Sequence, residues 1–378
     1  MSKKEKPTMY ILYPLFLDEK GEEFIIGGIQ QYILGLINTF KNDFTIVIVQ
    51  KAKFNFCKKF DDYIVKGSFL SKKNIGKELY KTIAKNIKKD DFIIWATDRI
   101  SIKTKQINTI SIQHGITFDF IDYNNIKFGR LLKKSLTLSI LYRILQQYSA
   151  IKFFLRTPKV VCVDYNFLNW ARIILPRNIT DRAIVIPNFS KLPDKSKRLD
   201  KEKKDIKILF ARRFVEYRGV FILSEIIEHF LKNNSNVYFG IYGEGPLESF
   251  LKEKFDKFEN IKISSYKAED SQKIQLEYDI SLIPTYGSEG TSLSLLESMS
   301  CGCVPIASNI GGMTNVVIDR YNGFLVDPIA ADFIDKIEYL IDNPNEINRI
   351  SEAARNSIEY GFLFHQWQER WKKIIKNS

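Results

Sequence analysis

The sequence predicts an α/β protein with two doubly wound parallel β-sheets. The chain has 378 residues, whereas a single hydrophobic core stops growing at about 250–300 residues. Short apolar runs alternate with longer amphipathic stretches, and a polar, lysine-rich segment at 189–204 separates two such series. Continuous apolar runs are typical of parallel strands that helices cover on both faces. We therefore expect two α/β domains joined by a linker.

The predicted strands form one series on each side of this linker. In the first half they are Tyr10–Phe16, Thr45–Gln50, Phe92–Ala96, Thr109–Gln113, Lys159–Asp164 and Ala183–Pro187. In the second half they are Ile206–Ala211, Val237–Tyr242, Ile261–Ser264, Asp279–Pro284 and Val304–Ala307. The amphipathic stretches between them make each series a succession of βαβ units. The expected domains are therefore 1–188 and 205–361, with the linker at 189–204.

Basic residues are concentrated in the first half of the chain. Residues 1–188 contain 31 Lys or Arg and 16 Asp or Glu, a net charge of +15, whereas residues 189–378 contain 26 and 28, a net charge of −2. This asymmetry indicates an anionic partner for the first domain, either a phosphate-rich ligand, an acidic membrane surface or nucleic acid. Because the basic half contains no recognised nucleic-acid-binding motif, we do not expect nucleic acid as a partner.

The cysteine pattern and the hydropathy favour a cytoplasmic protein. No CxxC pair occurs and there are only three histidines, which leaves little for a zinc site. The apolar run at 9–17 contains Pro14 and is followed by acidic residues where a cleavage site needs small ones, so we expect a buried strand rather than a secretion signal. No window offers the ~18 uninterrupted apolar residues of a membrane span. The cysteines are Cys57, Cys162, Cys301 and Cys303.

The segment 279–328 is the most informative part of the sequence. A buried strand is predicted to end at Pro284, followed by a glycine-containing loop and the start of a helix. Ligands of open α/β sheets bind at such carboxyl ends of strands, and the unpaired N–H groups of a helix start attract anions. The candidate binding residues are Glu289, Gly290, Thr291, Ser292, Leu293 and Glu297.

A capping box is the structural alternative for this helix start. In that interpretation Ser294 and Glu297 would only satisfy backbone amides of the first helical turn. It would account neither for Glu289, eight residues before Glu297, nor for the turn at 301–307 that leads into the next strand.

With these residues in order, the segment 279–328 resembles the E-x7-E region of retaining family 4 glycosyltransferases. Its two glutamates are Glu289 and Glu297, and a C-G turn, a G-G pair and an N-G pair follow as they do in that family. A second segment resembles the family's G-R-x4-K-G pattern. In this segment Arg213 takes the arginine position, Arg218 replaces the lysine, and Arg212 stands where glycine is usual.

Other stretches match the same family in the expected order. Gly27 and Gly28 resemble the glycine loop that approaches the donor, and His114 resembles the histidine that lines the donor sugar. Residues 243–246 match a G-x-G-P turn, and 184–188 match the strand that closes the first domain. Trp367 lies in the segment 362–378, which resembles the last helix of the family, a helix that braces the first domain.

The resemblance implies the GT-B fold, in which two Rossmann-like domains face each other across a cleft. It also implies transfer of a sugar, with retention, from a nucleotide diphosphate sugar to an acceptor hydroxyl, a hexosyltransferase reaction for which UDP-sugars are the leading donors. Glu297 would hold the ribose hydroxyls, and Glu289 the hydroxyls of the donor sugar. The catalytic set would be His114, Glu289, Arg213 and Arg218, and the donor-binding set would add Gly27, Gly28, Gly290, Thr291, Ser292, Leu293 and Glu297.

We expect neither a cofactor nor a metal ion. The chain contains no D-x-D pair, which metal-dependent glycosyltransferases use to hold a divalent ion beside the diphosphate. The charge of the leaving nucleotide would therefore be stabilised by Arg213, Arg218 and helix N-termini.

The stretch 127–156 predicts contact with a membrane surface. It has seven Lys or Arg, no acidic residue, and leucines and isoleucines at broadly helical spacing, a pattern typical of helices in anionic membrane interfaces. The alternative is a core-facing helix with a solvated basic side. We expect docking on the inner face of the plasma membrane and a saccharide or lipid-linked saccharide acceptor, as in bacterial capsule, O-antigen or lipopolysaccharide assembly. The expected membrane-side residues are Lys127, Arg130, Lys133, Lys134 and Arg143.

Two other function classes stay open from the sequence. A catalytically impaired GT-B protein that binds nucleotides or saccharides is compatible with Arg212 in the glycine position. A two-domain oxidoreductase is disfavoured, since the first strand is not followed by G-x-G-x-x-G. The identities of the base, the sugar and the acceptor do not follow from the residues.

Overall fold

The structure is a computed structural model that describes residues 6–25, 27–70, 74–116, 118–121, 123, 126–193, 206–233, 237–267, 270–287 and 289–377. The chain forms two compact units. The first comprises Met1–His114, Asp122–Ile186 and Gln368–Ser378, and the second comprises Gly115–Ile121 and Pro187–Trp367. Of the predicted linker, residues 194–204 lie outside the described residues.

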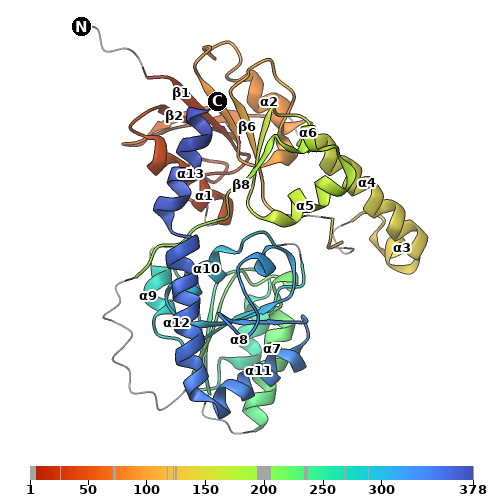
Figure 1. Cartoon of the computed structure of the whole chain (residues 1–378), viewed down its shortest axis with the longest axis vertical. Helices are drawn as coiled ribbons and strands as arrows, with labels where there is room; N and C mark the ends of the chain where they lie inside the picture. The colour runs from red at the N-terminus through yellow and green to blue at the C-terminus, as the bar shows by residue number, and fades with distance from the viewer. Residues whose placement is uncertain are drawn as a thin grey trace. The chain divides into compact units, whose positions relative to one another are not determined.

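The first unit contains an eight-stranded sheet with the order β3-β4-β2-β1-β5-β6-β7-β8 (Figure 1). All neighbouring pairs are parallel except β3 and β4. The strands are β1 Thr8–Leu12, β2 Thr45–Ala52, β3 Phe56–Lys59, β4 Ile64–Phe69, β5 Phe92–Trp95, β6 Thr109–Gln113, β7 Lys159–Cys162 and β8 Ala183–Val185.

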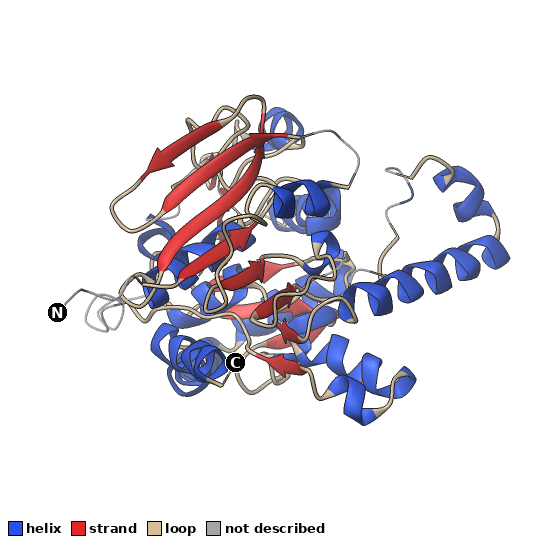
Figure 2. Cartoon of the chain, turned by 90° about the horizontal axis from the view of Figure 1, so that it is seen from above, coloured by secondary structure: helices blue, strands red, loops and turns tan. Residues whose placement is uncertain are grey.

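Helices connect these parallel strands. They are α1 Gly28–Phe40, α2 Ile75–Lys81, the 3-10 turn η1 Asp98–Ile100, α3 Gly129–Lys134, α4 Leu136–Phe154, α5 Tyr165–Ile174 and α6 Arg177–Thr180. Figure 2 shows α4 running outward from this unit, with α3 at its outer end. Only Ser139, Ala150 and Phe154 of α4 are buried, so most of this helix does not pack on the sheet.

The second unit contains a six-stranded, fully parallel sheet with the order β11-β10-β9-β12-β13-β14. The strands are β9 Ile206–Ala211, β10 Val237–Tyr242, β11 Ile261–Ser264, β12 Ile280–Ile283, β13 Val304–Ser308 and β14 Phe324–Val326. The helical elements are η4 Glu216–Arg218, α7 Val220–Lys232, α8 Glu248–Phe255, α9 Ser271–Gln275, α10 Leu293–Ser300, η6 Gly311–Asn315, α11 Ala330–Asp342, α12 Pro344–Gly361 and the start of α13 Phe364–Lys376.

Both sheets have doubly wound connectivity, which confirms the predicted fold class. In the second sheet two strands lie on one side of β9 and three on the other, and the strand order is that of a dinucleotide-binding fold. The order reverses between β9 and β12 there, and between β1 and β5 in the first sheet. Loops that leave the carboxyl ends of two such strands diverge to opposite faces of the sheet, so ligands bind at this position.

The strand predictions failed where burial is incomplete. The prediction did not include β3, which is mostly exposed, or β4, in which buried and less buried residues alternate. It also omitted β14, which has only three residues. The first strand was predicted too late: β1 occupies Thr8–Leu12, and the chain has left the sheet before Pro14.

The last helix, α13, completes the core of the first unit. Trp371 is fully buried, and its indole Nε1 donates a hydrogen bond of 2.9 Å to the hydroxyl of Tyr32 on α1. Lys159 Nζ donates to the backbone oxygen of Asn377 at 2.9 Å. Earlier on the same helix, the ring of Trp367 lies 4.6 Å from that of Phe189 within the second unit. The first unit is therefore assembled from both ends of the chain.

Replacement of Trp371 by alanine is expected to destabilise the first unit by about 3–5 kcal/mol, the usual cost of deleting a fully buried aromatic side chain. Trp170 on α5 is only partly buried, so Trp170→Ala provides a control with the same chemical change. Urea unfolding followed by circular dichroism measures both variants. Equal losses of stability in the two would contradict the role given to Trp371.

Candidate active site

Charged side chains of the second unit meet at the carboxyl ends of β9 and β12. Arg212 follows β9 directly, and Glu289 lies in the loop after β12. The backbone around Arg212 is fixed, because its N–H donates to Tyr242 O at 2.9 Å and the N–H of Phe214 donates to Glu244 O at 2.9 Å. The side chain of Arg212 therefore starts from a rigid strand end at the reversal point of the sheet.

Two arginines share one carboxylate at this point. Arg212 Nη2 donates to Glu289 Oε2 at 3.0 Å, and Arg218 from η4 pairs with the same oxygen. Burial lowers the pKa of Arg212 to about 10. Burial and the adjacent Arg212 charge lower the pKa of Arg218 to about 9. Both guanidinium groups are thus charged at neutral pH, and the cluster of Arg212, Arg218 and Glu289 carries a net positive charge.

Glycines allow the loop that carries Glu289 to pack closely on its neighbours. Gly219 has φ +85° and Gly311 has φ +55°, values that favour glycine. A Cβ atom at Gly219 would overlap the carbonyl oxygen of Pro284, and one at Gly311 would overlap that of Glu289. The N–H of Gly312 donates to Glu289 O at 2.9 Å. Side chains at these glycines would displace Glu289.

Helix α10 begins without a capping hydrogen bond from the side chain of its N-cap residue, Ser292. Thr291 and Ser292 are buried, and Asn188 Nδ2 donates to Thr291 O at 2.5 Å. Because the N-cap is Ser292, Ser294 lies inside the helix, and the capping-box alternative for Ser294 and Glu297 is wrong. The helix start is therefore suited to an anion.

Glu297 is held by α9 rather than by its own helix. Ser271 Oγ donates to Glu297 Oε2 at 2.7 Å, and Gln275 Nε2 donates to the same oxygen at 3.2 Å. Burial raises the pKa of Glu297, and the two hydrogen bonds oppose this rise. Burial and the nearby Glu297 raise the pKa of Tyr266 to about 12. Within the described ranges no hydrogen bond reaches Glu297 Oε1, so this oxygen is available to accept hydroxyl groups of a ligand.

The two adjacent arginines after β9 have different surroundings. Arg212 is buried, whereas Arg213 is exposed and its side chain makes no hydrogen bond or ion pair with the residues that the structure describes. In an extended segment successive side chains point to opposite sides. Sequence comparison assigned the phosphate role to Arg213 and treated Arg212 as a departure. The structure pairs Arg212 with Glu289, whereas Arg213 forms no ion pair in the described part of the chain but lies near enough to Arg218 to lower its pKa.

In the first unit, His114 lies directly after β6 and is held in one orientation. Its Nε2 donates to the carbonyl oxygen of Ala96 at 2.7 Å, and its ring meets Tyr32 edge-on at 5.5 Å. Burial lowers the pKa of His114 to about 4, although the hydrogen bond to Ala96 opposes this effect. The imidazole is therefore neutral at pH 7, with the proton on Nε2 and a hydrogen-bond acceptor at Nδ1.

Gly27 and Gly28 lie at the start of α1, where Gly27 is the N-cap and has extended backbone. No acidic side chain lies in the first turn of this helix, and no side chain caps it. The predicted glycine loop of the first domain thus presents a helix N-terminus. Nothing in the described part of the chain groups three or more His, Cys, Asp or Glu residues at a position suited to a metal ion.

The predicted membrane-side residues lie on the arm formed by α3 and α4 (Figure 1), except Lys127, which comes two residues before α3. Lys127, Arg130, Lys133 and Lys134 are exposed, and Arg143 is half-buried. No helix within the described ranges combines the length and apolarity needed to cross a bilayer. Nine large apolar side chains of the arm are between 40% and 78% exposed: Phe128, Leu131, Leu136, Leu138, Ile140, Leu141, Ile144, Leu145 and Tyr148.

The pKa of His114 predicts a loss of stability in acid. In the unfolded chain an imidazole binds a proton below about pH 6.5, whereas in the folded protein it does so only below about pH 4. Stability therefore falls as the pH drops from about 6.5 to 4, by roughly 2–3 kcal/mol from this group. His114→Gln keeps a donor for Ala96 and should lose less stability over this range. Urea unfolding of wild type and His114→Gln at pH 7.5 and 4.5 measures this difference. Equal losses of stability in the two proteins would contradict the prediction.

Comparisons with known proteins show what the chain is similar to. Residues 193–357 match the family of glycosyl transferases group 1. A curated Escherichia coli relative, UDP-Gal:alpha-D-GlcNAc-diphosphoundecaprenol alpha-1,3-galactosyltransferase, is 26% identical over 211 residues, which cover 54% of this chain and 54% of that protein. The chain spans about half the length of the curated relatives it matches.

Two solved structures resemble nearly the whole chain. Sucrose-phosphate synthase from Thermosynechococcus elongatus has a TM-score of 0.73 at 12% identity, covering 98% of this chain and 99% of the other. The Anabaena protein HepE in complex with UDP and glucose has a TM-score of 0.69 at 14% identity, covering 98% and 100%. These likenesses show the fold. The chain therefore has the GT-B fold, and residues 193–357 match the glycosyl transferases group 1 family.

Proposed function

We propose that the protein transfers a sugar from a nucleotide diphosphate sugar to an acceptor hydroxyl, with retention at the anomeric carbon. One observation carries the proposal: Glu289 pairs with Arg218 at the reversal point of the second sheet, in the loop that leads to the N-terminus of α10, inside the region that matches the family. This donor requires carboxylates that accept hydrogen bonds from its hydroxyls and cations that donate hydrogen bonds to its phosphates.

The donor would be held by groups of the second unit. Oε1 of Glu297 would accept ribose hydroxyls, since Ser271 and Gln275 already occupy Oε2. Glu289 would accept hydroxyls of the sugar, and the amides of Thr291, Ser292 and Leu293 would lie near the sugar and phosphate. Arg218, with Arg213, would stabilise the charge that grows on the diphosphate as the glycosidic bond breaks. We propose that this stabilisation needs no divalent metal ion.

In the first unit we propose that Gly27, Gly28 and His114 contribute to donor binding. His114 would act as a neutral hydrogen-bonding group rather than as an acid, because its pKa is lowered to about 4. A retaining transfer of this kind needs no carboxylate nucleophile if the acceptor attacks from the face that the nucleotide leaves.

The acceptor would be a saccharide, and we propose a lipid-linked one. The Escherichia coli relative acts, by its name, on a diphosphoundecaprenol-linked sugar. The α3–α4 arm supports the same class of acceptor, because its exposed apolar side chains lie beside basic ones. Such a surface fits an anionic lipid interface, where each basic residue contributes ~1 kcal/mol. UDP is the leading nucleotide, and the setting would be the inner face of the plasma membrane during surface-polysaccharide assembly.

Glu297→Ala is expected to weaken nucleotide binding strongly, because a carboxylate contributes roughly 1.5–3 kcal/mol for each charged hydrogen bond that it accepts. The measurement is a thermal-shift panel of UDP, GDP and ADP and their sugars on wild type and variant, with EDTA present throughout. Glu338→Ala is the control, because this exposed glutamate pairs with His229. If wild type responds to none of the nucleotides, the proposed function is wrong.

Binding to vesicles tests the role of the arm. Wild type is expected to co-sediment with anionic liposomes at low salt and to dissociate as salt screens the charges. Changing Lys133, Lys134 and Arg143 to Glu should abolish binding. The matched control changes Lys58, Lys59 and Lys85 to Glu, three exposed lysines of the same unit outside the arm. Equal behaviour of the two triple variants, or indifference to lipid charge, would overturn the proposed membrane contact.

A further inference from the structure

Arg212 is held in a position that ion pairing with Glu289 does not explain. Its side chain is only 4% exposed, and its Nη2 donates to Glu289. Nη1 is buried and has no hydrogen-bond partner among the described residues. Burial of an unsatisfied donor costs about 1–3 kcal/mol, and more for a charged group. The fold therefore keeps an arginine at this place against a local cost.

Neutralisation of Glu289 does not require Arg212. Arg218 pairs with the same carboxylate oxygen, so one arginine already balances its charge. The second guanidinium leaves the cluster with one uncompensated positive charge. The other charged or titratable neighbours are Tyr217, Tyr266 and Arg213, of which Arg213 adds a further positive charge. The cluster is thus short of negative charge.

The location of Arg212 indicates which anion fits. It follows β9 at the point where the strand order reverses, opposite the loop of β12, and this is where phosphorylated ligands bind in sheets of this type. A planar guanidinium offers paired N–H donors that match phosphate oxygens. Glycine, the usual residue of the family at this position, offers none.

We propose that Arg212 is an additional donor-binding residue of this chain, which exchanges Glu289 for an oxygen of the donor's diphosphate when the nucleotide sugar binds. This inference rests on the proposed function. In the donor-free protein Glu289 holds the guanidinium near the strand end, and in the bound protein Glu289 is released to the hydroxyls of the sugar. Arg212 and Glu289 therefore act as a preformed pair that the donor separates.

Calorimetric titration with UDP, GDP and ADP, and with the corresponding monophosphates, tests the exchange. With the nucleotide that binds wild type, Arg212→Gln should lower the affinity for the diphosphate at least tenfold and change the affinity for the monophosphate much less. Arg212→Lys should recover part of the loss, because the charge remains. Glu289→Gln should raise the affinity for the diphosphate several-fold, since it frees Arg212. This gain should vanish when Glu289→Gln is combined with Arg212→Gln.

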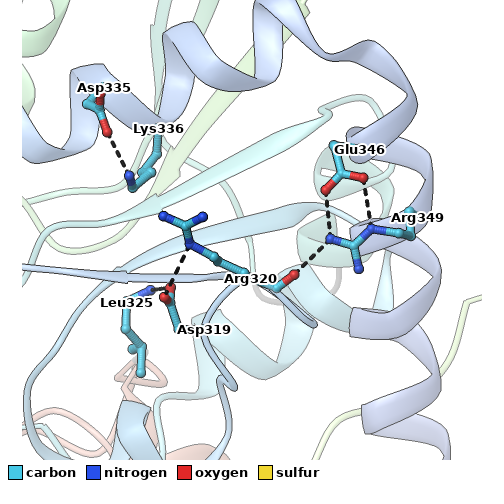
Figure 3. A network of polar contacts seen from close by, with 7 residues as sticks. All are labelled: Asp319, Arg320, Leu325, Asp335, Lys336, Glu346 and Arg349. Carbon is cyan, nitrogen blue, oxygen red and sulfur yellow. Dashed lines mark hydrogen bonds and ion pairs between the residues drawn. The ribbon is translucent and has the colours of Figure 1, made fainter.

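A surface arginine of the same unit provides the control. Arg349 pairs with Glu346 and donates to the backbone oxygen of Arg320 at 2.8 Å, in the exposed network of Figure 3. Arg349→Gln removes the same charge from the second unit and should leave all affinities unchanged.

The possible outcomes separate this inference from the proposed function. If no nucleotide binds wild type, the proposed function fails and the inference fails with it. If a nucleotide binds and Arg212→Gln or Arg212→Gly binds it as well as wild type or better, Arg212 obstructs or ignores the diphosphate, and the inference alone is overturned. Melting temperatures identify any variant that fails to fold. If Arg212→Gln does not fold, the affinities of Arg212→Lys and Glu289→Gln for the diphosphate still test the inference.

Discussion

The geometry of the second unit depends on the reversal of strand order between β9 and β12. At this point two neighbouring parallel strands send their connections to opposite faces of the sheet, so the backbone ends diverge and leave polar groups between them. Arg212 and Glu289 meet there from the two strands. Gly219, Gly311 and Gly312 hold the β12 loop close enough for that meeting, and Arg218 joins from η4. The charged cluster is thus a product of topology.

A cluster of two arginines and one glutamate is costly in a ligand-free protein. Desolvation penalises each charge, and the two guanidinium groups repel each other. Functional sites commonly keep such local costs, which the surrounding fold offsets. Here the offset is visible in the core beneath the site, where apolar side chains of β9, β10, β12 and β13 pack with α7, α8 and α11. The core of the unit is apolar and regular, and the cluster of Arg212, Arg218 and Glu289 lies at the carboxyl ends of its strands.

Fold and site were predictable from the sequence to different degrees. Fully buried parallel strands such as β5 and β12 have mostly apolar sequences, so their positions followed from the residues. The edge strand β3 and its neighbour β4 carry polar residues, and their places in the sheet arise from pairing of β4 with β2 and of β3 with β4 rather than from their own pattern. The partners of individual side chains likewise depend on contacts between distant segments and cannot be predicted from a local pattern.

In the site, the sequence motif predicts which residues are present but not which side chains they contact. The spacing of Glu289 and Glu297 was visible in the sequence, but the partners of Glu297 come from α9, which approaches only in the folded chain. The choice between Arg212 and Arg213 depends on the direction in which the chain leaves β9. A pattern of letters contains neither piece of information, because both are set by packing between elements distant in sequence.

The position of Trp371 has a consequence for the order of folding. The first unit consists of residues from the start of the chain and of Gln368–Ser378 from its far end. During synthesis the sheet of that unit emerges first, but Trp371 cannot pack beside Tyr32 until α13 has been translated. Domains generally fold as they leave the ribosome, first domain first. This chain departs from that order, because the unit that begins first is the one whose core is closed last, after the second unit has been made.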